Sequence, residues 1–339
     1  MNATSNNEIS NEPLIPWYVN GAVAIICAVV LLAMVALGPL GTGSIVYRSS
    51  ESAIMQIEGN DITNLFVMVP LLLIGGALAL AKKDGAKYFL VLTPITIMYY
   101  ALSVGIGQEW GNVNYPGNVE HYFWLFLILI IGGLILLIGS LSMFTNGDAP
   151  KFRTRGLRLF VGLTVLFLVL FGAMWVMQTM GVINTGDLVD GSYSAAPTSF
   201  WVIRYLDLGI SIPVGFIALF MMLSKPERAY RLVLLFFGFL VTTATAVNAM
   251  AIMQLLNNDP AALSLGPGIA IFMVLGILSY TLLYFMVRDK VVAWRGRSSR
   301  SGRPRPERLA RPAISSISFL SPDRRSGIAP IGKTALFAS

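Results

Sequence analysis

An arginine and an aspartate stand three residues apart in an otherwise apolar stretch, SFWVIRYLDLGISIPVGF, from Ser199 to Phe216. A charged side chain at the centre of a bilayer costs about 2.5–3.5 kcal/mol even on the mildest insertion scales. Residues three apart share one face of a helix, so Arg204 and Asp207 can neutralise each other. Two interpretations stay open: a self-neutralising pair that reaches toward the membrane interface, and a counterion or proton-relay group that faces the interior of a bundle.

The same stretch holds three residues that support this pair. Tyr205 lies between the two charged residues, and Ser211 follows Asp207 by four residues, on the same helix face. Pro213 predicts a bend that frees a backbone carbonyl for local hydrogen bonding.

A second polar pattern lies in LVTTATAVNAM, residues 240–250, where three polar side chains recur at helical spacing: Thr242, Thr245 and Asn248. Side chains of this kind most often join neighbouring helices through hydrogen bonds. The alternative interpretation is a polar stripe along an ion pathway.

The composition places the chain in a membrane. Of its 339 residues, 55% are hydrophobic and 12% are charged, whereas about a quarter of an ordinary globular domain is charged. Such a chain cannot cover a water-facing surface. The chain has one histidine, His121, and one cysteine, Cys27. A zinc or haem site built from these residue types is therefore not expected, and no metal is predicted.

Eight segments have the roughly 20 apolar residues that a membrane span needs. They are 16–38, 63–81, 88–107, 121–143, 157–181, 200–223, 230–255 and 268–287. The predicted fold is therefore all-α, a polytopic membrane helix bundle of about eight transmembrane helices. With these bounds Asp207 is the only acid inside a span, and Asp61 falls in the connection before the second span.

Four regions follow from this division. They are an N-terminal tail (1–15), a three-helix membrane region (16–118), a five-helix membrane region (119–290) and a polybasic tail (291–339). From residue 288 onward the chain holds 12 of its 24 Lys and Arg against three acids. This Arg-, Ser-, Gly- and Pro-rich tail predicts disorder. It is either attracted to anionic lipid or a solvated appendage; nucleic acid is not an expected partner.

The distribution of Lys and Arg predicts the orientation. Connections after the second, fourth and sixth spans hold ten basic residues, and those on the opposite side hold only Arg48. The basic side is expected to be cytoplasmic, so that both termini lie in the cytoplasm of a multi-pass protein of the cell membrane. Soluble-enzyme motifs are absent from the sequence, and no enzyme activity is expected.

The order Arg204, Tyr205, Asp207, Ser211 and Pro213, with two aromatic residues ahead of it, resembles the third helix of microbial (bacteriorhodopsin-like) rhodopsins. The helices and connections around this motif extend the resemblance over about 121–289, half the chain. Upstream, residues 70–110 also read like a first-and-second helix hairpin of that family, which suggests an internal duplication.

The resemblance implies that Arg204 would be the gating arginine and Asp207 the counterion of a retinal Schiff base. It also implies a retinal-bearing lysine in the seventh helix, but every lysine here lies in a connection, at a helix end or in the tail. No cofactor is therefore predicted, and retinal is not expected to be bound covalently.

Three functional hypotheses remain. The first is an opsin-derived protein with a sensory or ion-translocation role. The second is a small-solute or ion transporter unrelated to rhodopsins, and the third is a membrane-anchoring subunit. The expected partners are the lipid bilayer and either another membrane protein or a second copy of the chain.

Overall fold

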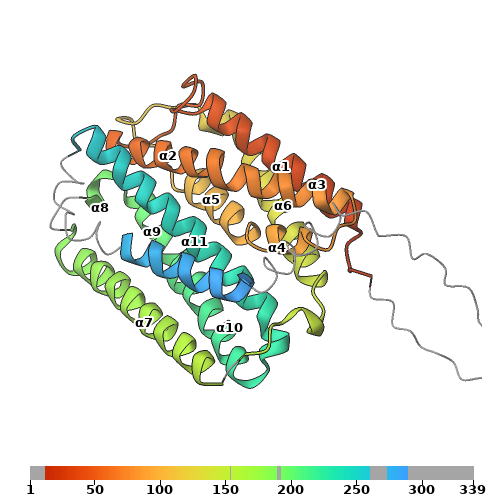
Figure 1. Cartoon of the computed structure of the whole chain (residues 1–339). Coiled ribbons are helices and arrows are strands. Elements are labelled where there is room, and N and C mark those ends of the chain that lie inside the picture. Colours follow the sequence, from red (N-terminus) through yellow and green to blue (C-terminus); the bar gives the residue numbers. More distant parts are fainter. Residues whose placement is uncertain (1–11, 153, 189–191, 260–272, 289–339) are drawn as a thin grey trace, which may run out of the picture. The chain divides into compact units, whose positions relative to one another are not determined.

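The computed structural model describes residues 12–152, 154–188, 192–259 and 273–288, all of which belong to one compact unit of the chain. The described residues form helices joined by short connections and contain no β-strand (Figure 1). The α-helices are α1 (Trp17–Leu37), α2 (Glu51–Thr63), α3 (Val69–Leu80), α4 (Ala86–Leu90), α5 (Pro94–Ile106), α6 (Phe123–Ser142), α7 (Thr154–Thr185), α8 (Ser192–Ala195), α9 (Pro197–Leu206), α10 (Ile212–Ser224) and α11 (Pro226–Leu256). Two π-helical segments, η1 (Asn64–Met68) and η4 (Asp207–Ser211), and two 3-10 turns, η2 (Val119–Tyr122) and η3 (Asn146–Asp148), complete them.

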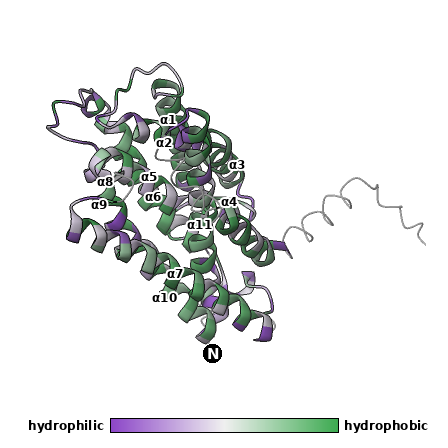
Figure 2. Cartoon of the chain, turned by 90° about the vertical axis from the view of Figure 1, so that its left-hand side faces the viewer, coloured by the Kyte–Doolittle hydropathy of each residue, from purple (hydrophilic) through white to green (hydrophobic). Residues whose placement is uncertain are grey.

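Seven helices in the described part of the chain are long and apolar enough to cross a bilayer. They are Trp17–Leu37, Glu51–Leu80, Ala86–Ile106, Val119–Ser142, Arg155–Thr185, Pro197–Ser224 and Pro226–Leu256. Figure 2 shows these helices mostly in the hydrophobic colour, with hydrophilic residues concentrated in the connections. The chain is thus a multi-pass helical membrane protein, as its composition predicts.

The predicted eighth span, 268–287, lies partly outside the described residues. Its described portion is an apolar helix, Met273–Arg288, which is shorter than the other seven. The predicted tail, 291–339, lies wholly outside them, as does most of the N-terminal tail.

The second span needs a correction. Its helix begins at Glu51 rather than near residue 63, and it runs without a break to Leu80. The polar composition of the first turns resembles a loop, but this part of the helix packs along α11 (Figure 1). Asp61 consequently lies within a spanning helix and is fully buried, so Asp207 is not the only acid inside a span.

The buried apolar side chains form two clusters. The first is built from helices α1 to α6, and the second from α7, α10, α11 and the helix at 273–288, with Val91 and Phe144 added. Side chains of α6 such as Phe126 and Leu136 belong to the first cluster. Along the chain, Met143 belongs to the first cluster and Phe144 to the second. Helices α1–α6 are called the first group below, and α7–α11 with the helix at 273–288 the second group.

Both groups of helices contain the same irregular element. The second long helix of each group carries a five-residue π-helical segment, η1 or η4, and a proline follows that segment by two residues, at Pro70 and Pro213. Proline lacks an N–H and its ring clashes with the carbonyl four residues earlier, and a π-bulge relieves that clash by widening the turn. The second span of each group thus contains a local irregularity in its helical hydrogen bonding.

The two groups of helices approach closely where they meet. A Cβ atom added to Gly59 of α2 would lie 2.4 Å from the backbone of Met250 in α11, and one added to Gly238 of α11 would lie 2.5 Å from the Cα of Leu92. Between these points the hydroxyls of Thr96 and Thr242 lie 2.5 Å apart. The helices α2, α5, α9 and α11 therefore form the contact between the groups.

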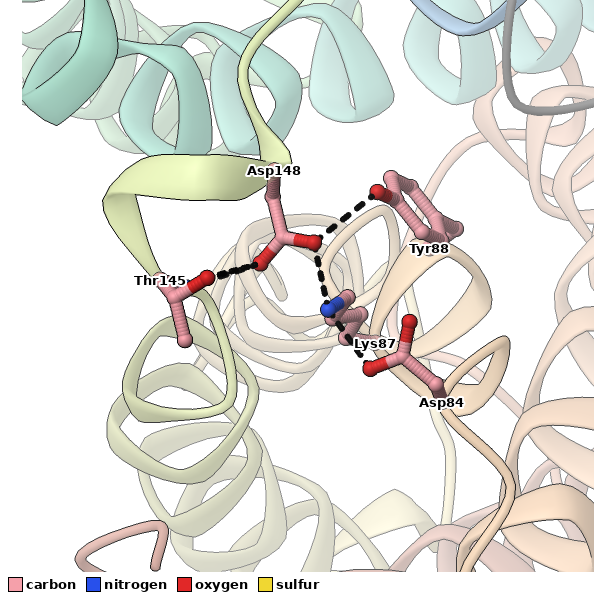
Figure 3. A network of polar contacts seen from close by, with 5 residues as sticks. All are labelled: Asp84, Lys87, Tyr88, Thr145 and Asp148. Carbon is pink, nitrogen blue, oxygen red and sulfur yellow. Dashed lines mark hydrogen bonds and ion pairs between the residues drawn. The ribbon is translucent and has the colours of Figure 1, made fainter. Parts of the chain in front are cut away.

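A buried lysine secures the connection between the two groups at the basic end of the bundle. The Lys87 amino group lies 2.7 Å from a carboxylate oxygen of Asp84 and 2.7 Å from one of Asp148, which also accepts bonds from Tyr88 and Thr145 (Figure 3). Burial alone would raise the pKa of Asp148, but the hydrogen bonds from Lys87 and Thr145 outweigh it and hold that pKa below its ordinary value.

Candidate functional site

The charged stretch identified in the sequence lies where α9 passes into η4, and the side chain of Arg204 is buried there. Its guanidinium carbon lies 3.7 Å from the ring centroid of Phe200 and 4.0 Å from that of Trp175, so the cation lies against two aromatic faces. One Nη atom donates a hydrogen bond to the side-chain oxygen of Gln178. The Nε atom is buried without a hydrogen-bond partner among the described residues.

Asp207 begins the π-helical segment η4 and is 4% exposed. Its Oδ2 atom accepts a hydrogen bond of 2.7 Å from the indole Nε1 of Trp175. Between described residues, the ion pairs within 4.0 Å are Arg48–Glu120, Lys87–Asp84 and Lys87–Asp148, so Arg204 and Asp207 form no direct pair. Both charged side chains instead contact Trp175, one through the face of the ring and one through its N–H.

Two other helices complete the site. Trp175 and Gln178 lie three residues apart on α7 and therefore on one face of it. From α5, Tyr99 is close enough to interact electrostatically with both Asp207 and Arg204. The ring of Tyr99 lies 5.3 Å from that of Phe239 in α11, which brings the site to the contact between the two groups of helices.

The residues predicted to support the pair have different positions. Tyr205 is 72% exposed and points away from the site. Ser211 is buried, and its hydroxyl donates to the backbone oxygen of Leu206 at 3.2 Å. Pro213 follows the π-helical segment, where the expected irregularity of the helix is found.

The predicted polar stripe of the seventh span is divided between two neighbours. Thr242 is buried against Thr96 of α5. Thr245 contacts the hydroxyl of Tyr280 at 2.7 Å, and the Asn248 amide lies near Gly276, both in the helix at 273–288. Only Thr242 faces the contact between the two groups of helices.

Sequence reasoning missed Trp175 and Gln178 as members of the site. Gln178 carried a signal, since it is the only amide side chain between residues 157 and 181 of an apolar segment, and an unpaired amide is costly inside a membrane. Trp175 carried none, because aromatic residues are common in spans. Tyr99 fits either an aromatic belt or the wall of a pocket, and the sequence does not decide between them.

The arrangement places two ionisable side chains, Arg204 and Asp207, in a low-dielectric environment. A buried carboxyl group can take up or release a proton, and a guanidinium whose Nε has no partner among the described residues can bind an anion or a substrate oxygen. Both groups are located beside a π-bulge, a type of irregularity that is frequent at functional sites.

Comparison with protein-family models, with curated proteins and with solved structures finds no match to this chain. The fold and the site therefore define a class only: a multi-pass helical membrane protein with buried charged residues at the contact between two groups of helices. The resemblance to microbial rhodopsins stays a prediction.

Proposed function

We propose that the protein translocates an ion or small solute across the cell membrane, with Arg204 and Asp207 on the pathway. The observation that carries the proposal is the burial of both charged side chains inside one span, beside a π-bulge and without a direct ion pair. Charges that served only structure would gain most from pairing with each other. Here the Nε atom of Arg204 keeps an unused bonding capacity among the described residues, which a transported species can satisfy.

The position of the site supports the same function. Sites of secondary transporters lie near the middle of the membrane, at the contact between repeated groups of helices and on interrupted helices. Arg204 and Asp207 lie on a helix whose regular turns are disturbed by the π-helical segment η4, and the first part of this helix, α9, packs on α5 of the other group. We place the basic end of the bundle in the cytoplasm, on the positive-inside rule.

The experiment is a flux assay on the whole chain reconstituted into liposomes that enclose a pH-sensitive dye, with a membrane potential imposed by a potassium gradient and valinomycin. The expected result is a potential-driven change of internal pH that Asp207→Asn reduces at least tenfold. Tyr205→Phe is the matched control, because this neighbouring side chain is 72% exposed and outside the site.

The outcomes separate the alternatives. Proton flux lost in Asp207→Asn and retained in Tyr205→Phe supports the proposal. If proton flux is absent, the same vesicles are tested with sodium, potassium and chloride gradients. No flux of any of these ions, in vesicles that contain correctly folded protein, would contradict ion translocation.

An opsin-derived protein without covalent retinal is the second candidate. The observation that favours it is the aromatic enclosure of the charged pair by Trp175 and Phe200. The amino group of Lys87, the lysine with a buried side chain in the described residues, is engaged by two aspartates (Figure 3). Retinal added to the purified protein is expected to give no visible band of a protonated Schiff base, and such a band would contradict this candidate.

A further inference from the structure

A second buried acid lies in the other group of helices. Asp61 of α2 is fully buried, three residues before the π-helical segment η1. Its Oδ1 atom accepts a hydrogen bond of 3.4 Å from the hydroxyl of Tyr100 in α5. Its Oδ2 atom lies against the end of α1, where a Cβ added to Gly38 would be 2.9 Å away, and has no hydrogen-bond partner among the described residues.

Among the described residues, the surroundings of Asp61 contain hydroxyls and an amide but no cation. Tyr47, from the connection between α1 and α2, is buried and interacts electrostatically with Asp61 and Tyr100. Asn64, one turn further along the helix, has a buried amide nitrogen with no partner in the described part of the chain. Burial, reinforced by Asp61, raises the pKa of the Tyr47 hydroxyl, so this group stays neutral, and its oxygen has no hydrogen-bond partner among the described residues.

Among the described residues, the ionisable groups on neighbouring elements have the wrong sign, have no charge, or are paired elsewhere, so none balances Asp61. On its own helix the nearest is Glu58, an acid. From α5 and the α1–α2 connection come the two tyrosine hydroxyls, and the connection also carries Arg48, whose guanidinium is paired with Glu120 at 2.6 Å. On α11, which packs along α2, no residue between Arg231 and the end of the helix at Leu256 is ionisable, and α1 contributes only Tyr18 and Cys27, far from its end at Gly38.

A carboxylate in this position cannot remain charged. Moving an isolated ionised carboxylate into a medium of low dielectric constant costs tens of kcal/mol in the idealised limit, and real groups take up a proton instead. The packing of Oδ2 against Gly38 leaves little room for a hydrated cation. The smallest monovalent cation, the proton, fits the site.

We propose that Asp61, enclosed by Tyr47, Tyr100 and Gly38, is a proton-binding site in the amino-terminal group of helices. The same irregular element marks both buried acids, since a π-helical segment and a proline accompany Asp61 as they do Asp207. The claim of proton binding stands on the contacts of Asp61 alone. That this proton is exchanged during translocation rests on the proposed function.

Proton exchange at Asp61 requires access to water past the connection 38–50. Tyr47 in that connection is buried. The backbone N–H of the neighbouring Arg48 donates to the side-chain oxygen of Gln108, and its backbone oxygen accepts from the N–H of Glu109, both at 2.7 Å. The guanidinium of Arg48 pairs with the Glu120 carboxylate at 2.6 Å. The segment around Tyr47 therefore covers the site from the end of the bundle opposite the basic connections. Movement of this segment is the step that would expose the carboxyl group.

The test is infrared spectroscopy of the full-length protein in detergent at neutral pH, in a buffer with choline chloride. The expected spectrum contains the C=O band of a protonated carboxylic acid, which shifts in D₂O, is lost in Asp61→Asn and is kept in Glu58→Gln and Asp207→Asn. Because asparagine has nearly the shape of a protonated aspartate, Asp61→Asn is also expected to leave the unfolding midpoint almost unchanged.

Three results would overturn the proposal. The first is a wild-type spectrum identical to that of Asp61→Asn, which would mean that the carboxyl group is ionised. The second is failure of Asp61→Asn to fold, because a neutral isostere should be tolerated. The third is loss of the band when sodium chloride replaces choline chloride, which would make sodium the occupant. None depends on transport, so failure here is distinguishable from failure of the flux assay.

Discussion

The contact that joins the two buried charges is the indole of Trp175, and replacing it with phenylalanine isolates the contribution of one hydrogen bond. Trp175→Phe keeps an aromatic ring for Arg204 but removes the N–H that donates to Asp207 at 2.7 Å. A hydrogen bond to a charged group contributes about 1.5–3 kcal/mol to stability. A phenyl face also attracts a cation less than an indole does. The free energy of unfolding is therefore expected to fall by about 2–3 kcal/mol.

The assay is equilibrium unfolding in mixed detergent micelles by titration with sodium dodecyl sulfate. Trp124→Phe is the matched control, because Trp124 of α6 is 67% exposed and such surface changes usually stay within about 0.5 kcal/mol. In an Asp207→Leu background the carboxylate is gone, and Trp175→Phe should then cost less by about 1 kcal/mol or more. Equal costs for Trp175→Phe and Trp124→Phe, or the same cost in both backgrounds, would refute the proposed link between the charges.

Three further changes test other parts of the structure. Lys87→Met leaves the buried Asp148 without its cation and should lower the free energy of unfolding by about 3–5 kcal/mol. The control, Lys83→Met at an exposed lysine, should lower it by less than about 1 kcal/mol. Similar losses in the two variants would contradict the burial of this network. Because the pKa of Asp148 is depressed in the folded state, its contribution is complete above its unfolded value of about 3.9 and is lost as the pH falls through the folded value. Measured against pH, the free energy of unfolding of the wild type should fall on the acid side, and that of Asp148→Asn should fall less. Parallel curves for the two proteins would argue against a stabilising role of the ionised Asp148. Gly59→Ala places a Cβ 2.4 Å from the backbone of α11 and should lower the free energy of unfolding by about 1–3 kcal/mol. In Gly156→Ala the added Cβ meets nothing within 4 Å, so this control should be neutral or stabilising in the same detergent titration. Equal effects of the two changes would mean that α2 and α11 are not in close contact.

The helical fold and the membrane spans could be predicted from the sequence because continuous apolar runs decide them. The exception is the first half of the second span. Its residues Glu51–Thr63 are too polar for a hydropathy criterion, and they are helical within the bundle because they pack along α11, far away in the sequence. Asp61 was therefore placed in a connection, and the second buried acid was missed.

The candidate site could be predicted only along its own helix. The spacing of Arg204 and Asp207 indicated a shared face, and Pro213 indicated an irregular helix. Their partners come from α7 and α5, which no local pattern relates to the sixth span. The direct ion pair expected from the spacing is replaced by contacts with Trp175, since an aromatic face and an indole N–H can satisfy both charges separately.

The most direct test of a pathway at this site is the reach of water to η4. In a Cys27→Ala background, Ser211→Cys places a thiol at a buried position beside the charged residues, whereas the neighbouring Ile210 is half exposed on the outside of the bundle. A membrane-impermeant, water-soluble thiol reagent is expected to label Ser211→Cys in sealed vesicles and to leave Ile210→Cys unlabelled. Labelling of Ile210→Cys alone, or of neither position, would contradict a water-accessible pathway past Arg204 and Asp207.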